Sequence, residues 1–150
     1  MNGVKVKPVP LLMAAAAGSL MAVQGAFNSL LAKAIGLPRT TLLVHVLGTL
    51  AAGVLVLLPW RDGGSFGRLG ESPWYTLLGG PIGVGIVLLV AASIARTGAG
   101  AATTAIIVAQ LLTAYLLDHF GLFGLARLPF DLWKAAGIGL IAAGGWLLLC

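Results

Sequence analysis

The stretch that decides the fold runs from Trp74 to Ala95 and reads WYTLLGGPIGVGIVLLVAASIA. It contains no Asp, Glu, Lys or Arg, it follows Pro73, and it closes at Arg96. An α-helix needs about 20 apolar residues to cross a hydrocarbon layer about 30 Å thick. The stretch therefore predicts a membrane-spanning helix, with Pro73 suited to its first turn and Trp74 to the level of the lipid headgroups.

Four more stretches of this kind flank the first one. The next begins after only Arg96, Thr97 and Gly98, which predicts a tight antiparallel hairpin. The predicted spans cover residues 11–32, 41–58, 74–95, 99–117 and 132–149. No stretch is long or polar enough for a second domain, so residues 1–150 are predicted to form a single transmembrane domain. The fold class is all-α integral membrane, with five transmembrane helices and the two ends on opposite faces.

The composition excludes most other classes of protein. The chain is 59% hydrophobic and 9% charged, whereas a soluble domain carries about 25% charged residues. The net charge of +5 comes from nine Lys and Arg spread over short loops, so no patch for nucleic acid is expected. The single cysteine, Cys150, permits no internal disulfide. Since no nucleophile triad, P-loop or metal-ligand spacing occurs, we predict neither an enzyme nor a metal or cofactor site.

The basic residues of the loops predict only a weak preference for one orientation in the membrane. The amino-terminal side holds Lys5, Lys7, Arg61, Arg68, Arg127 and Lys134, and the other side holds Lys33, Arg39 and Arg96. Six against three favours a cytoplasmic amino terminus under the positive-inside rule, but neighbouring acids offset part of the larger count. The chain is therefore predicted to insert in both orientations.

Small residues form faces on which helices can associate. Gly79 and Gly83 have GxxxG spacing, which favours close packing of helices in lipid. In the last span, Ala136, Gly137, Ala143 and Gly144 recur seven residues apart and form a smooth seam on one side of the helix. Packing within the chain is one interpretation of such a face. We favour Gly137 and Gly144 as a dimer interface.

Polar side chains within the spans are the candidate substrate-binding residues. No charged residue lies in the middle of a span, so a buried carboxylate that exchanges a proton for a cation is missing. Gln24 and Asn28, His45 with Thr49, and Gln110 form polar stripes on three helices. Unpaired amides in hydrocarbon cost several kcal/mol. We therefore predict that Gln24, Asn28, His45 and Gln110 converge on one cavity. The alternatives are interhelical hydrogen bonds for the amides and a bond from His45 to a nearby carbonyl.

Two charged residues near the end of the fourth span suggest a gate. Asp118 ends that span and Arg127 lies in the amphipathic connection that follows. An ion pair between the two could open and close access to the cavity. The alternative is an ordinary solvated start of the loop.

Three sequence elements together resemble a known family. They are Gln24-Gly25-Ala26-Phe27-Asn28, then Gly79-Gly80-Pro81-Ile82-Gly83, and Gln110 eight residues before Asp118-His119-Phe120-Gly121. In this order they resemble the YdcZ-like family of the drug/metabolite transporter (DMT) superfamily. The resemblance implies a five-helix half-transporter, because larger relatives carry two inverted five-helix halves and short members assemble from two chains. More distant multidrug-resistance relatives use a glutamate in the first helix, which this chain lacks.

The sequence thus favours one function. We expect a multi-pass secondary transporter or exporter of a small organic metabolite or cation in the bacterial inner (plasma) membrane. It would work by alternating access as an antiparallel homodimer of dual topology, with the lipid bilayer and a small-molecule substrate as its other partners. A paired homologue could replace the second copy. Two different functions also fit the sequence: a non-transporting subunit that stabilises a larger membrane complex, and a subunit of a lipid-carrier flippase.

Overall fold

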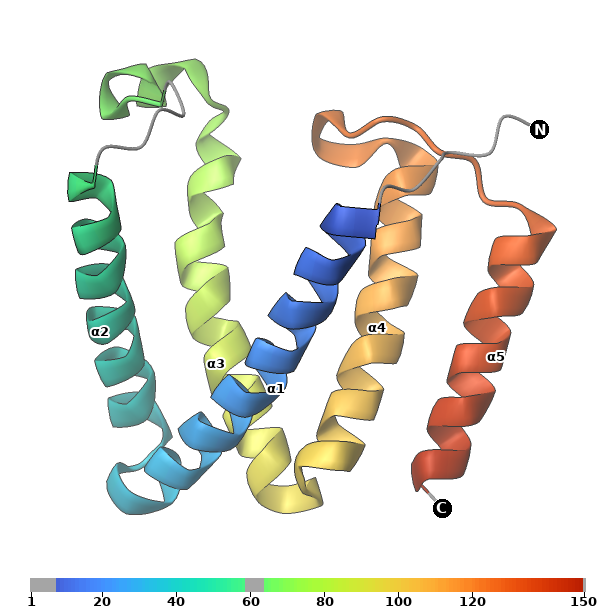
Figure 1. Cartoon of the computed structure of the whole chain (residues 1–150), viewed down its shortest axis with the longest axis horizontal. Helices are drawn as coiled ribbons and strands as arrows, with labels where there is room; N and C mark the ends of the chain where they lie inside the picture. Colours follow the sequence, from blue (N-terminus) through green and yellow to red (C-terminus); the bar gives the residue numbers. More distant parts are fainter. Residues whose placement is uncertain (1–7, 59–63, 150) are drawn as a thin grey trace. The chain divides into compact units, whose positions relative to one another are not determined.

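The computed structural model describes residues 8–58 and 64–149, and these residues form helices and no β-strand (Figure 1). The α-helices are α1 (Pro8–Ile35), α2 (Leu37–Leu57), α3 (Gly79–Thr97), α4 (Ala99–Phe120) and α5 (Leu132–Leu149). Short 3-10 helices are η1 (Phe66–Glu71), η2 (Trp74–Leu78) and η3 (Leu122–Gly124). Lys5, Lys7, Arg61 and Cys150, which entered the predictions, lie outside the described residues.

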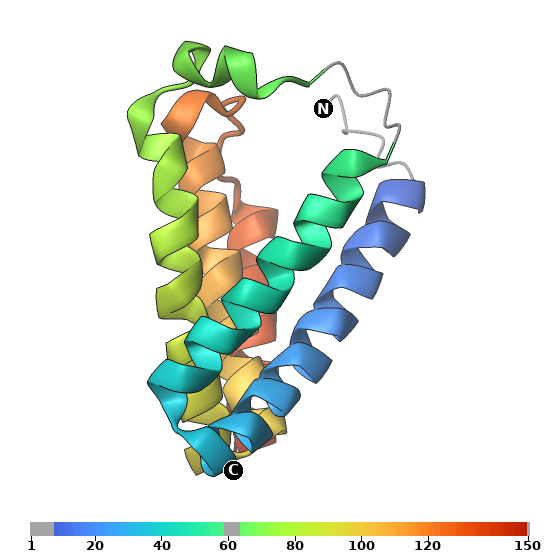
Figure 2. The same ribbon diagram turned by 90° about the vertical axis from the view of Figure 1, so that its left-hand side faces the viewer.

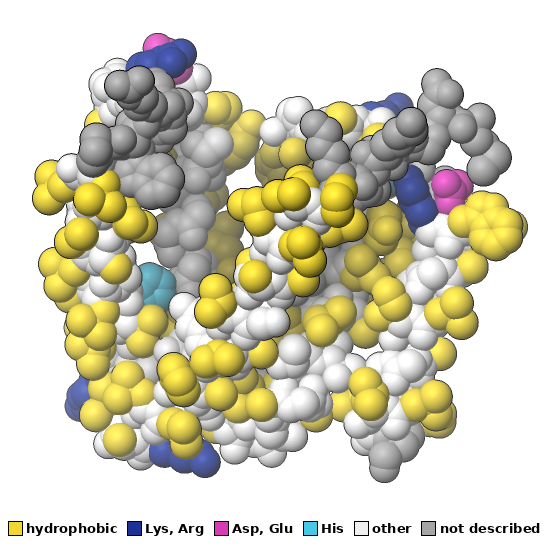
Figure 3. All heavy atoms as spheres, viewed as in Figure 1, with side chains coloured by type: hydrophobic (Ala, Val, Ile, Leu, Met, Phe, Trp, Pro, Cys, Tyr) yellow, Lys and Arg dark blue, Asp and Glu magenta, His cyan; other side chains and the backbone are white. Residues whose placement is uncertain are grey.

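The five predicted spans are confirmed. Five helices are long and apolar enough to cross a membrane, the third of them being η2 and α3 together, Trp74–Thr97. Large apolar side chains on these helices face outward, such as Leu12, Leu50, Leu89 and Leu140 at 70%, 62%, 73% and 74% exposure. Figure 3 shows apolar side chains along the helices and charged ones at their ends. Such a surface suits lipid rather than water.

The helix ends differ from the predicted ones by a few residues, for local reasons. The second span starts at Leu37 rather than at residue 41, since Pro38 occupies the first turn of α2 instead of breaking it. The first turn of a helix tolerates proline because its N–H would have no partner there. In the third span, Trp74–Leu78 is a 3-10 helix and α3 proper begins at Gly79. The fourth span continues to Phe120.

Single glycines separate two pairs of consecutive helices. Gly36 lies between α1 and α2, and Gly98 lies between α3 and α4, each with φ of +83°. Side-chain-bearing residues rarely adopt this conformation, whereas glycine adopts it freely. The carbonyls of Gly36 and Gly98 accept the N–H of Thr40 and Ala102 at 3.0 and 3.2 Å. Each glycine therefore ends one helix and starts the next without a longer loop.

The described chain forms two compact units, Met1–Ala95 (unit 1) and Arg96–Cys150 (unit 2). In unit 1, α1 and α2 meet at their turn and diverge away from it in Figure 1, whereas in the view of Figure 2 they run nearly parallel. Helix α3 approaches α1 at Gly25, where a β-carbon would lie 2.8 Å from Cδ1 of Ile94 and 3.0 Å from Cγ1 of Val90. Glycine at this position thus lets side chains of α3 reach the backbone of α1. The predicted single domain stays a prediction.

In unit 2, helices α4 and α5 pack along a face marked by Ile138 and Gly145, seven residues apart and both buried. A β-carbon at Gly145 would lie 3.1 Å from Cγ2 of Thr104 and 3.4 Å from Cγ2 of Val108. The predicted seam is a neighbouring face of the same helix. At Gly137 and Gly144 a β-carbon would meet no described atom within 4 Å. Gly144 is exposed, whereas Gly137 is half-buried and lines the hollow between α4 and α5 beside Ile138.

Candidate functional site

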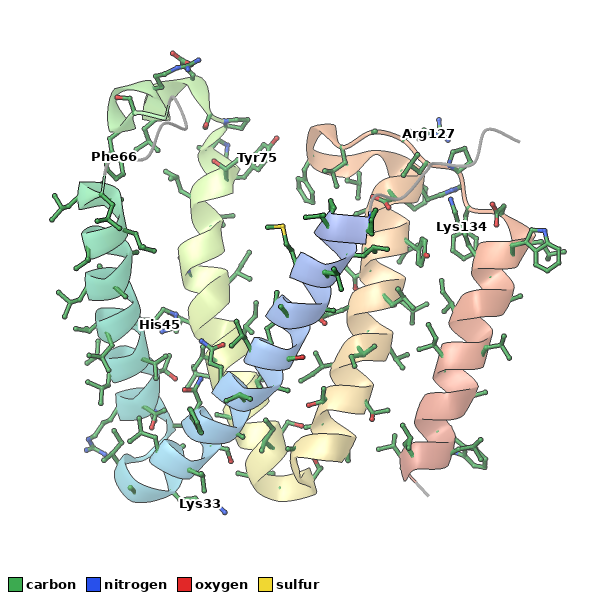
Figure 4. All side chains as sticks on the ribbon, in the orientation of Figure 1. Lys33, His45, Phe66, Tyr75, Arg127 and Lys134 are labelled. Atoms are coloured by element: carbon green, nitrogen blue, oxygen red, sulfur yellow. The ribbon has the colours of Figure 1, made fainter. Side chains whose placement is uncertain are left out.

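His45 is the histidine that lies inside a span of unit 1. It is the ninth residue of α2, about 12 Å along the helix from Leu37. Its ring is half-buried and points from α2 toward α3 (Figure 4). The Nδ1 atom lies 2.8 Å from the carbonyl oxygen of Thr41, one turn earlier on the same helix. This bond fixes the orientation of the ring.

The other ring nitrogen of His45 faces a glycine. A β-carbon at Gly83 of α3 would lie 3.6 Å from Nε2. Among the described residues Nε2 has no hydrogen-bond partner. Since Gly83 has no side chain, the imidazole approaches the backbone of α3 and keeps one polar nitrogen available. Figure 3 shows this histidine reaching the surface of unit 1 beside α2.

Helix α1 contributes a buried amide to the same unit. Asn28 and Ser29 are 6% and 4% exposed, and they share a face of α1 with Gly25. Gly25 contacts α3 at Val90 and Ile94. Val90 and Ile94 lie seven and eleven positions after Gly83, so all three residues occupy one face of α3. Gly25, which shares a face of α1 with Asn28, and His45 of α2 therefore both approach one side of α3.

The structure distributes the four predicted binding residues over different environments. Asn28 is buried and His45 half-buried, whereas Gln24 is exposed at the edge of its face. Gln110 is exposed on α4, in unit 2. The convergence of all four on one cavity stays a prediction. None of them lines the hollow of about 540 Å³ beside Leu55 and Phe66, or the one of about 320 Å³ between α4 and α5.

The connection from α4 to α5 is organised by backbone atoms and by His119. The Nε atom of Arg127 donates to the carbonyl of His119 at 3.1 Å, and the N–H of Leu128 donates to the carbonyl of Asp118 at 2.8 Å. The N–H of Phe130 donates to Nδ1 of His119 at 3.0 Å. Asp118 and Arg127 form no ion pair within the described chain, whose side-chain ion pair is Arg68 with Glu71. A gate formed by Asp118 and Arg127 stays a prediction.

Two residues that orient the His45 ring were not among the sequence candidates. We paired His45 with Thr49, four residues later, but the ring bonds to the backbone of Thr41, four residues earlier, and Thr49 is exposed. The spacing of Thr41 and His45 is visible in the sequence and could have indicated the bond. Gly83 was noted only as part of a GxxxG element. That it faces His45 depends on how α2 and α3 pack.

Comparisons with known proteins agree with the fold and with the apolar surface. A family model described as "Putative inner membrane exporter, YdcZ" matches residues 9–147. No curated protein and no solved structure matches the chain. The match covers all five spans almost completely and supports a transporter role in a membrane. The chain, with its five spans and its polar residues in α1, α2 and α4, belongs to the YdcZ family of the DMT superfamily.

Proposed function

We propose that this chain is a secondary transporter that exports a small organic solute across the bacterial inner membrane, and that its substrate contacts are centred on His45. The observation that carries the proposal is the available Nε2 of His45, which faces Gly83 in a part of α2 that holds no charged side chain. Polar groups within a span are costly and commonly mark a substrate or ion path.

Asn28 supports the same assignment. It is buried, and it shares a face of α1 with Gly25, which approaches the side of α3 that His45 also approaches. An amide both donates and accepts hydrogen bonds, so it can position a polar solute beside the imidazole. Gln24 on α1 and Gln110 on α4 would join the site in the assembled transporter, because a binding site between two halves uses residues that are exposed in one half alone.

We propose further that two chains of opposite orientation form the working unit. The loop charges favour one orientation only weakly. The seam at Gly137 and Gly144 offers a smooth strip of α5 that is exposed at Gly144, and a β-carbon at either glycine would meet no described atom within 4 Å. Two such faces can meet in an isologous contact. Rocking of the two halves about the site would then give alternating access.

The test is solute export by purified protein in liposomes, with Gly83→Val as the variant. A β-carbon at position 83 would already be in van der Waals contact with Nε2 of His45, so the methyl groups of valine should displace the ring. We expect this displacement to lower transport at least tenfold. Gly85→Val is the matched control, because a β-carbon there meets no described atom within 4 Å. Wild-type protein that moves no solute, but co-purifies with one larger complex, would instead indicate a stabilising subunit. Equal transport by both variants would remove His45 from the substrate path.

A further inference from the structure

The hydrogen-bond partners of the two histidines fix opposite tautomers. A carbonyl oxygen can only accept, so Nδ1 of His45 must donate its hydrogen to Thr41, and in the neutral ring Nε2 is then a bare acceptor. A backbone N–H can only donate, so Nδ1 of His119 is the acceptor for Phe130 and its Nε2 carries the hydrogen. The chain has only these two histidines. His45 therefore presents a lone pair toward α3.

Resting on the proposed function, we propose that Nε2 of His45 binds either a proton or an uncharged solute that donates an O–H or N–H hydrogen bond, and that the solute is exported in exchange for a proton. Both ligands need the same lone pair, so they exclude each other. A proton entering from outside binds Nε2 and breaks the hydrogen bond to the departing solute. On the inside the proton leaves to water and the next solute binds. One proton enters for each solute that leaves, and no bond within the solute changes.

The charges around His45 favour an uncharged solute. The charged residues on the first three α-helices are Lys33 of α1, Arg39 of α2 and Arg96 of α3, all within a turn of a helix end. The acid described in unit 1 is Glu71, outside the spans and paired with Arg68 at 3.0 Å. A cationic solute would therefore lack a counter-charge at the site. An anionic solute would be repelled by the lone pair that Nε2 presents.

The first test is nitrogen NMR of full-length protein labelled with ¹⁵N-histidine, in lipid bilayers at pH 8. The expected spectrum contains one ring protonated at Nδ1 and one protonated at Nε2. His119→Asn, which keeps a side-chain oxygen as an acceptor for Phe130, should remove only the second ring and so assign the first to His45. If His45 carries its hydrogen on Nε2, the inference is overturned, whatever the protein transports.

The second test is exchange in liposomes that contain a pH-sensitive dye and an equimolar mixture of probes. The probes are mannitol, uridine and nicotinamide as uncharged donors, choline and putrescine as cations, and lactate as an anion. We expect movement of at least one uncharged probe, accompanied by opposite proton movement. Acidification should weaken binding of the uncharged probe, because a proton on Nε2 of His45 occupies the lone pair that the probe needs.

Two variants separate binding from proton exchange. His45→Gln can place an amide oxygen near the position of Nε2, so it should still pass the uncharged probe downhill without proton movement. His45→Asn can keep a donor for the carbonyl of Thr41, but it has no group at the position of Nε2. It should therefore neither pass the uncharged probe nor move protons. His119→Asn should behave as wild type.

The outcomes distinguish this inference from the proposed function. Movement of a cation or anion alone, or proton exchange that persists in His45→Gln, would overturn the inference and leave a transporter. If wild-type protein moves none of the probes, the proposed function fails and the inference falls with it. Gel filtration of each variant in detergent separates loss of exchange from loss of folding.

Discussion

Gly25 offers the sharpest test of how α1 and α3 pack in unit 1. In Gly25→Ala, the new methyl would lie 2.8 Å from Cδ1 of Ile94 and 3.0 Å from Cγ1 of Val90. Carbon atoms in contact prefer a separation of about 3.5–4.0 Å. Ile94 must therefore retreat by about 0.7 Å and Val90 by about 0.5 Å. The end of the isoleucine side chain can rotate away, but the β-branched valine is stiff at χ1.

Overpacking of this kind typically costs about 1–3 kcal/mol. We expect about 2 kcal/mol for Gly25→Ala, because one of the two neighbours can move easily and the other cannot. Gly18→Ala is the matched control on the same helix, since a methyl there meets no described atom within 4 Å. It should not lower the free energy of unfolding, because alanine is favoured over glycine inside a helix by about 0.5–1 kcal/mol.

The assay is unfolding of the purified full chain by SDS in mixed micelles, followed by far-ultraviolet circular dichroism. Ile94→Val removes Cδ1, the closer of the two atoms, and should by itself cost about 0.5–1.5 kcal/mol. Combined with Gly25→Ala it should cost about 1 kcal/mol less than the sum of the two single changes, since the pair is in contact. Equal stability of the Gly25 and Gly18 variants, or strict additivity with Ile94→Val, would refute the close approach of α1 and α3.

The remaining predictions concern the seam, the α4–α5 connection and the turns. Gly144→Leu should convert dimers to monomers in single-molecule counting. Gly139→Leu is the control, on the opposite side of α5 and equally open, and it should leave dimers intact. Dimers in both variants would show that the seam is not the interface. His119→Ala should speed hydrogen exchange of the Phe130 amide by about 2- to 13-fold, because one hydrogen bond is lost. His119→Asn should restore the protection, and unchanged exchange in both variants would contradict the bond. Gly36→Ala, at φ of +83°, should cost about 1–2 kcal/mol in the same SDS titration. Its control Gly48→Ala, in open space on α2, should cost nothing measurable, and equal costs would argue against a strained turn.

The sequence alone was sufficient for the fold class and the number of spans. Long stretches without charge, such as Trp74–Ala95, have one stable arrangement in lipid, because a helix satisfies its own backbone hydrogen bonds. The ends of the helices were predicted less well. The second span was predicted to start at residue 41, although proline at position 38 is compatible with the first turn of a helix that starts at Leu37. Gly36 alone makes that turn, since its positive φ reverses the chain within one residue.

For the candidate site, the sequence indicated the candidate residues, but only the structure showed what surrounds them. The residue types Asn28 and His45 stand out in the sequence, because polar groups in apolar spans need partners or a function. Their surroundings could not be predicted: Gln24 and Asn28 are one turn apart, yet only Asn28 is buried. Which face of α1 is buried depends on the contact of Gly25 with Val90 and Ile94, which are distant in sequence. Likewise, the packing of α2 against α3 places Gly83 opposite Nε2 of His45. Helical periodicity determines which residues share a helix face. Which other helix contacts that face depends on how side chains of the two helices fit together, and this fit exists only in the tertiary structure.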